Sequence, residues 1–159
     1  MEKFYNDVDK AYAMLDLNRK IVGVKLIKTS EEFEAIDAIQ ISRPMSYCVA
    51  VKSATGGHSI KFNKDTSDCG GSTRALGLEE PSYDFFNGTE GCKLGLFKDR
   101  ESAMSIASQT SNIFTNTYGV LVQPIEKYGH NIYPDVVLII SHPREMMRVM
   151  QGYTYHYGI

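Results

Sequence analysis

Amphipathic helical segments alternate along this chain with short runs rich in Val and Ile, and this alternation limits the fold more than any other feature of the sequence. Across residues 3–17, apolar side chains recur at the spacing of one helical stripe, namely Phe4, Val8, Ala11, Tyr12 and Leu15. Such a stripe must pack on another element, and we expect it to pack on a sheet. The alternation predicts an α+β fold, with a mixed sheet flanked by helices in a single layered domain over residues 1–159.

Residues 20–28 predict a strand that places Val22, Val24 and Leu26 on one face. The continuous apolar run 136–140 predicts a strand covered on both faces. The other segments that we expect are, in chain order, a helix beginning at Ser30, a helix over 45–55 with Pro44 before it and Gly56 after it, a strand over 58–62, a helix over 72–78, a loop with one helical turn over 84–96, a helix over 99–110, a strand over 118–125 and a last helix capped by Ser141.

The charge balance excludes some classes of partner. The net charge is -2, and the 17 Lys and Arg residues form no basic run, so there is no electrostatic footprint for nucleic acid. The N-terminal residues are acidic where a signal peptide needs an apolar stretch, and no apolar run approaches the roughly 18 residues of a membrane-spanning helix. We therefore expect a cytoplasmic protein that binds neither nucleic acid nor membrane.

The chain has three cysteines, Cys48, Cys69 and Cys92, an odd number that favours free thiols over a closed disulfide framework. No C-x-x-C pair occurs, but thiolates from separate elements can meet in a fold. One hypothesis is that the three sulfurs hold an iron–sulfur cluster, or a zinc ion with His58 as a fourth ligand. The alternative is that they are three unrelated thiols packed in the core.

Cys69 is distinctive because Gly70 and Gly71 follow it, and glycines let backbone amides approach a ligand closely. A position near the start of a helix would also lower the pKa of its thiol. Cys69 is thus a candidate ligand or nucleophile, with His58 as one partner, while the alternative is a tight turn before a helix. Gly70, Gly71 and Arg74 together predict an anion site, with a solvated arginine as the alternative.

His156 lies in an aromatic cluster over residues 153–157. Such a cluster is typical of a pocket that stacks on a planar ligand, or of an interface or core. The H-x-x-x-H, H-E-x-x-H and G-x-S-x-G motifs are absent from the sequence, so it carries neither a zincin nor a Ser-His-Asp hydrolase signature. The apolar Met146, Met147 and Met150 of the last helix would suit the interface of a homo-oligomer.

Several segments in order resemble a known family: Arg43-Pro44 followed by residues 47–52, Asp68–Gly71 followed by residues 74–78, and residues 134–140 followed by 150–156. They are similar to domain-of-unknown-function family 169, which has no agreed activity. Members of this family usually continue beyond the Tyr-rich segment into a second half with further cysteine and glycine motifs. The resemblance implies that a site needing such residues is incomplete in this sequence or is completed by a partner.

Three functional hypotheses follow. The first is a cytoplasmic domain in which Cys69, with Cys48 and Cys92, ligates an iron–sulfur cluster or another thiophilic metal. The second is a small-molecule or anion-binding protein, or an enzyme that depends on Cys69. The third is a structural or oligomeric interaction module without catalysis. The sequence leaves the three open.

Overall fold

A mixed β-sheet forms the centre of the computed structural model, which describes residues 2–109, 116–129 and 132–158. Within these residues the sheet has five strands in the order β2-β3-β4-β1-β5. β2 pairs with β3 in parallel, and the other neighbouring strands are antiparallel. The strands are β1 (Val22–Ile27), β2 (Ile39–Gln40), β3 (Ile60–Asn63), β4 (Gly119–Pro124) and β5 (Val136–Leu138). This sheet and the helices around it confirm the α+β class.

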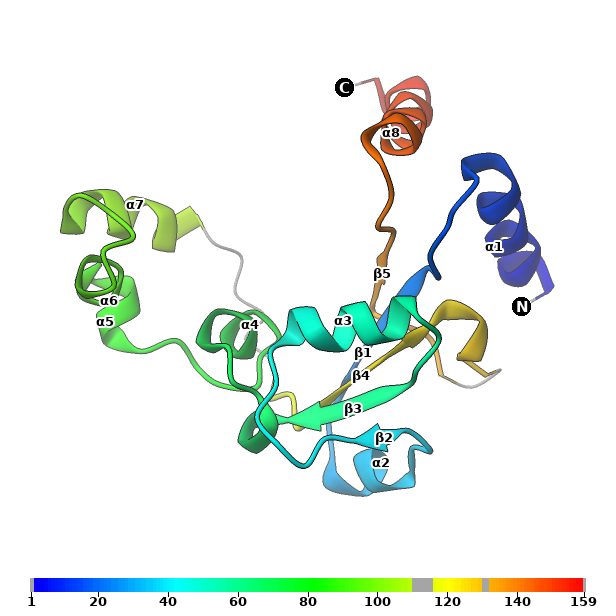
Figure 1. Ribbon diagram of the computed structural model, residues 1–159. Helices are drawn as coiled ribbons and strands as arrows, with labels where there is room; N and C mark the ends of the chain where they lie inside the picture. Colours follow the sequence, from blue (N-terminus) through cyan, green and yellow to red (C-terminus); the bar gives the residue numbers. More distant parts are fainter. Residues whose placement is uncertain (1, 110–115, 130–131, 159) are drawn as a thin grey trace.

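Helices cover both faces of the sheet and also extend beyond it. They are α1 (Glu2–Leu15), α2 (Ser30–Ala35), α3 (Tyr47–Thr55), α4 (Gly70–Ala75), α5 (Tyr83–Phe86), α6 (Thr89–Lys93), α7 (Arg100–Gln109) and α8 (Pro143–Tyr157), with 3₁₀ turns η1 (Lys64–Thr66) and η2 (Ile125–Lys127). α3 lies along one face of the sheet, α1 and α8 lie to one side, and α5–α7 project to the other (Figure 1). None of the described helices is both long and apolar enough to cross a membrane.

The main core lies between α3 and the sheet. Val22, Val24 and Leu26 of β1 all belong to this core, which confirms the predicted face of the strand. Side chains of a strand alternate between the two faces, so neighbouring strands contribute every second residue. The partners from α3, β3 and β4 are Ala50, Val51, Ala54, Ile60, Phe62, Val120 and Val122. Removal of these apolar side chains from water is the main source of stability at this face.

On the opposite face, two glycines let aromatic rings lie directly against the strands. A Cβ atom on Gly23 would collide with the ring of Tyr128, and one on Gly119 would collide with the ring of Phe33 from α2. Both rings are almost fully buried, with Tyr128 2% and Phe33 1% exposed. The absence of a side chain at each glycine creates the space into which the ring packs.

Replacement of Gly119 by alanine should destabilise the protein, because the Phe33 ring must move to make room for the new methyl group. Overpacking of a core costs about 1–3 kcal/mol, and we expect a loss of this size in urea unfolding at equilibrium. Gly152 of α8 is the matched control, since a Cβ there meets no atom within 4 Å and alanine favours a helix. Equal stability of the two variants would contradict this account of Gly119.

A buried lysine connects α2 to the sheet. Lys61 of β3 is 4% exposed, and its Nζ donates hydrogen bonds to the carbonyl oxygens of Phe33 at 2.9 Å and Ile36 at 3.0 Å. A longer contact of 3.4 Å reaches the Glu34 carbonyl. Carbonyls at the end of a helix lack intrahelical partners, and the helix dipole favours a cation there. The ammonium also lies 4.9 Å from the centroid of the Phe33 ring, so it holds both the helix end and its buried side chain.

Lys61→Met keeps the apolar stem of the side chain but removes the donors. Because buried acceptors that lose their partner cost about 1–3 kcal/mol, the free energy of unfolding should fall by that amount. The exposed Lys52 of α3 is the control, and Lys52→Met should change the free energy of unfolding by less than about 0.5 kcal/mol. Urea denaturation followed by circular dichroism measures both values. A Lys61→Met protein as stable as the parent would show that α2 does not depend on this contact.

Two predicted helix starts are displaced by one residue. The N-cap of α2 is Thr29 and not Ser30, and its hydroxyl accepts a hydrogen bond from the backbone N–H of Glu32 at 3.2 Å. The N-cap of α8 is His142 and not Ser141. In both cases a neighbouring residue takes the cap, because local signals define a helix end only to within one or two residues.

Other helical segments also differ from the prediction in their bounds. Met45 forms a bridge with Ser67, so α3 begins at Tyr47 and not at residue 45. α4 already begins at Gly70, so the glycine pair is the first turn of the helix and not a turn before it. The segment 84–96 contains most of α5 and all of α6, whereas one helical turn was expected.

The prediction that residues 136–140 form a strand covered on both faces is wrong. β5 spans Val136–Leu138, and in the described sheet it pairs with β1 alone. As a result Val136 is 43% and Val137 is 46% exposed. A continuous apolar run is typical of a central strand, but this one lies at the edge of the described sheet.

Candidate functional site

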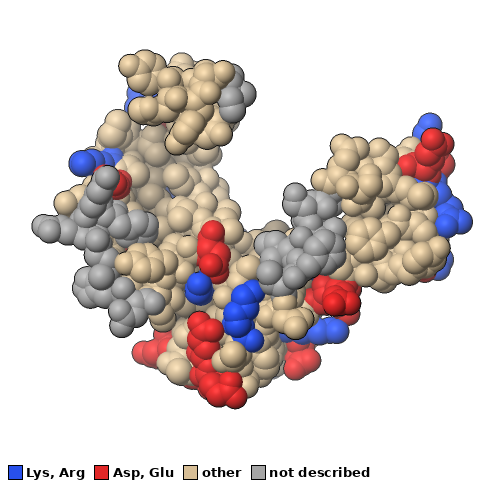
Figure 2. All heavy atoms as spheres, turned by 180° about the vertical axis from the view of Figure 1, so that it is seen from behind, with Lys and Arg blue, Asp and Glu red and all other residues tan. Residues whose placement is uncertain are grey.

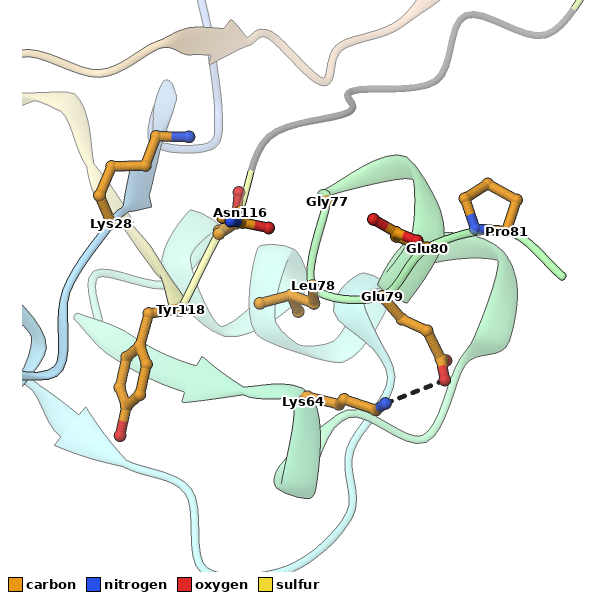
Figure 3. A pocket seen from close by; sticks show the side chains of 10 residues that line it. Lys28, Lys64, Gly77, Leu78, Glu79, Glu80, Pro81, Asn116 and Tyr118 are labelled. Carbon is orange, nitrogen blue, oxygen red and sulfur yellow. Dashed lines mark ion pairs between the residues drawn. The ribbon is translucent and has the colours of Figure 1, made fainter.

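A cavity opens where β1 ends and β4 begins (Figure 3). Its volume of about 520 Å³ falls within the range of small-ligand sites, roughly 300–1,000 Å³. The walls come from four separate parts of the chain, and the lining residues are Lys28, Lys64, Gly77, Leu78, Glu79, Glu80, Pro81, Asn116, Thr117 and Tyr118. Sequence reasoning missed this site, because residues so far apart form no motif.

The end of α4 directs the chain into one wall of the cavity. Gly77 has a φ of 71°, a left-handed conformation that glycine adopts without steric cost. Its N–H donates to the Arg74 carbonyl, and the Leu78 N–H donates to the Thr73 carbonyl, both at 3.0 Å. These two bonds form a Schellman motif, which ends the helix and turns the chain. Leu78 then packs into the main core, and the two residues after it lie at the cavity.

The residues before β4 form the adjoining wall. The Thr117 N–H donates to the Gly77 carbonyl at 3.1 Å, and the Tyr118 N–H donates to the Ile27 carbonyl at 2.8 Å. The Tyr118 ring meets the Phe33 ring edge to face, with 5.6 Å between the centroids. This wall is therefore joined by backbone hydrogen bonds to the turn after α4 and to β1, and by a ring contact to α2.

The charged side chains of the cavity do not all neutralise one another. Lys64 Nζ lies 3.0 Å from Glu79 Oε1 and forms an ion pair with it. Among the described residues, neither the Lys28 ammonium nor the Glu80 carboxylate has a hydrogen-bond or ion-pair partner. Asn116 lies between these two groups in Figure 3. Within the described part of the chain, the cavity thus presents charges of both signs without a partner, and in this view they lie on either side of a neutral amide.

Cys69 is the N-cap residue of α4 and is partly exposed. The Ser72 hydroxyl and the Ser72 amide lower the pKa of its thiol, and the Gly71 amide contributes. The sulfur makes no regular capping hydrogen bond, and the Ser72 hydroxyl also donates to the Cys69 carbonyl at 2.9 Å. The predicted position of Cys69 near a helix start is confirmed, and the donors around it favour the thiolate.

Iodoacetamide should alkylate Cys69 at a lower pH than an ordinary thiol, because the thiolate is the form that displaces iodide. In a Cys48→Ser/Cys92→Ser protein, the rate should reach half its plateau below about pH 8.5. Ser72→Ala removes a donor and should move this midpoint upward, whereas Ser53→Ala in α3 should not. Mass spectrometry across a pH series measures the rates. A midpoint at or above 8.5 in the protein with Ser72 intact would contradict the assignment.

Arg74 is bound to α6. Its Nη1 and Nη2 donate to the two carboxylate oxygens of Glu90 at 2.8 and 2.5 Å, and its Nε donates to the Gly70 carbonyl at 2.9 Å. Arg74 lowers the pKa of the Glu90 carboxyl group, so the pair persists at neutral pH and weakens only as acid protonates Glu90. The anion site predicted at Gly70, Gly71 and Arg74 stays a prediction, and an anion there would have to displace Glu90.

The chain matches the family described as "Uncharacterised ArCR, COG2043" (DUF169) over residues 12–159. It belongs to domain-of-unknown-function family 169. The resemblance inferred from the sequence is therefore confirmed. A separate comparison with curated proteins finds "Uncharacterized protein MJ0308" of Methanocaldococcus jannaschii, which is 25% identical over an aligned length of 155 residues that covers 94% of this chain. The chain spans 64% of the length of that relative. No solved structure matches this chain.

The segments that carry the resemblance to family 169 lie in different parts of the fold. Residues 47–52 belong to the core helix α3, and residues 134–140 include the edge strand β5. Residues 68–78 contain α4, with Cys69 at its start and Gly77 beyond its end. This last segment is the one that reaches the cavity wall, so it links the family pattern to the candidate site.

The structure places the three cysteines on three different helices. Cys48 is exposed in α3, Cys69 caps α4, and Cys92 lies in α6. Among the described residues, no three His, Cys, Asp or Glu side chains are grouped so that they could hold a metal ion. The predicted convergence of these thiolates, with or without His58, is therefore not found. The exposure of Cys48 also argues against the alternative that all three fill the core.

α8 carries His156 away from the cavity. The His156 ring contacts Tyr155 and Tyr157, with centroids 5.4 and 6.3 Å apart, and no described residue of α8 is buried. From behind, α8 at the upper left shows mostly uncharged side chains (Figure 2). Met147 is 56% and Met150 is 59% exposed. His156 as a ligand-stacking residue and α8 as an oligomer interface both stay predictions.

Proposed function

We propose that the protein binds a small polar molecule in the cavity between β1, α4 and β4. The observation that carries this proposal is the pair of charged groups, Lys28 and Glu80, that line the cavity without a partner among the described residues. Groups of this kind favour a ligand whose charges are complementary to theirs. The proposal belongs to the small-molecule class of the sequence hypotheses, but it moves the site from the start of α4 to the chain beyond its end.

The way in which the walls are built supports the proposal. Ligand sites are usually preformed, with polar groups at fixed positions on a partly apolar surface. Here the Schellman motif holds Leu78, and the Thr117–Gly77 hydrogen bond joins the two walls. Leu78 supplies an apolar lining residue, and Asn116 supplies a neutral donor and acceptor. The positions of the charged groups thus depend on backbone hydrogen bonds and core packing.

The other hypotheses have weaker support. The lowered pKa of Cys69 is a property that a nucleophile needs, but Cys69 does not line this cavity. A cluster or zinc site is not part of the proposal, because the described residues contain no suitable ligand group. The interaction-module hypothesis has the exposed α8 in its favour. A cytoplasmic location remains an expectation from the sequence.

Equilibrium dialysis against a mixture of low-molecular-weight cell metabolites tests the proposal. Mass spectrometry should find at least one compound enriched with the parent protein and lost with the Lys28→Ala/Glu80→Ala variant, because the variant lacks both unpaired charges. Lys52→Ala/Glu101→Ala makes the same change of charge on exposed residues of α3 and α7, away from the cavity, and should retain the compound. If the cavity variant retains every compound that the parent retains, the cavity is not the binding site.

A further inference from the structure

We infer that the ligand is a zwitterion of the size of an aliphatic amino acid, with its carboxylate against Lys28 and its ammonium against Glu80. This inference rests on the proposed function, because it names the ligand class of the same cavity. Its basis is the opposite charge of Lys28 and Glu80 and the position of the Asn116 amide between them in Figure 3.

The balance of charge disfavours a ligand that carries one charge only. Lys64 and Glu79 form an ion pair at 3.0 Å, so Lys28 and Glu80 are the charged lining residues without a partner among the described residues. An anion bound at Lys28 would also experience repulsion from Glu80, and a cation bound at Glu80 would experience repulsion from Lys28. A molecule with both charges gains attraction at each end and leaves neither side chain unpaired.

The neutral group between the charges suits the same ligand. Asn116 lies between Lys28 and Glu80 in the close view (Figure 3). A side-chain amide has two N–H donors and one carbonyl acceptor, so it can donate to a carboxylate and accept from an ammonium. In an amino acid these two groups are attached to one carbon atom. Asn116 is therefore placed to contact the region where the two groups meet.

The rest of the lining points to an aliphatic side chain. The core buries most of Leu78 and leaves 8% of its surface exposed, and the partly exposed Pro81 follows on the same segment of the lining. Gly77, which has no side chain, leaves room beside them. A ligand side chain without polar atoms would cover this apolar surface and remove it from water. Lys64 stays paired with Glu79, so it does not call for a third charged group on the ligand.

Isothermal titration calorimetry with three compounds of similar shape tests the inference. The compounds are L-leucine, 4-methylpentanoate, which lacks the amino group, and 3-methylbutylamine, which lacks the carboxylate. L-leucine should bind at least about tenfold more tightly than either of the others, because each of them leaves one wall charge unpaired. Equal or tighter binding of 4-methylpentanoate or 3-methylbutylamine, or no binding of L-leucine, would overturn the inference.

Single variants assign the two charged groups. Glu80→Gln should weaken L-leucine about tenfold and leave 4-methylpentanoate no weaker, while Lys28→Met should weaken L-leucine and leave 3-methylbutylamine no weaker. Glu101→Gln in α7 is the control and should change none of these affinities. Circular dichroism spectra check that each variant is folded. Unchanged affinity for L-leucine in both cavity variants would also overturn the inference.

The two proposals fail in different ways. If dialysis retains a compound that depends on the cavity charges, but that compound carries a single charge, the binding function stands and the zwitterion inference is wrong. If dialysis retains no compound that depends on these charges and L-leucine does not bind, both proposals are wrong.

Discussion

The buried ammonium of Lys61 is the contact on which the candidate site depends most. It binds the last carbonyls of α2 and lies over the Phe33 ring, which fixes that helix on the sheet. Phe33 in turn fills the space above Gly119, the first residue of β4, and meets the ring of Tyr118. Through these contacts Lys61 of β3 is linked to Tyr118, which lines the cavity.

Much of the fold could be predicted from the sequence, because local patterns specify local structure. The helical spacing along α1 and the alternation along β1 need no tertiary information, and the structure has a helix over Glu2–Leu15 and the predicted face of β1 in the core. The burial of Lys61 could not be predicted in this way, since a lysine in a strand normally marks the exposed face. The edge position of β5 could not be predicted either, because an apolar segment such as Val136–Leu138 is typical of a strand covered on both faces.

The candidate site was harder to predict than the fold. Lys28, Glu80 and Asn116 are ordinary surface residue types, and only their approach in space gives them a common role. The cysteines, by contrast, stand out in the sequence, because a thiol is a possible ligand or nucleophile wherever it occurs. The structure separates them because each is held by its own helix, so that Cys69 is left with an environment that the sequence did anticipate. Gly77 was a usable signal, because glycine after a helix predicts a chain reversal.

The bidentate contact between Arg74 and Glu90 connects the projecting helices to the cavity. The segment that leads from α4 to α5 contains Glu80, and its two ends are held by the Schellman motif and by the contact of α6 with Arg74. The centroid of the Phe85 ring in α5 lies 5.0 Å from the same guanidinium, which adds a cation–π contact to the ionic one. Arg74 therefore joins the helices α5–α7 to α4, next to the segment that carries Glu80. Loss of the contact between Arg74 and Glu90 would remove one of the constraints on the position of Glu80 in the cavity wall.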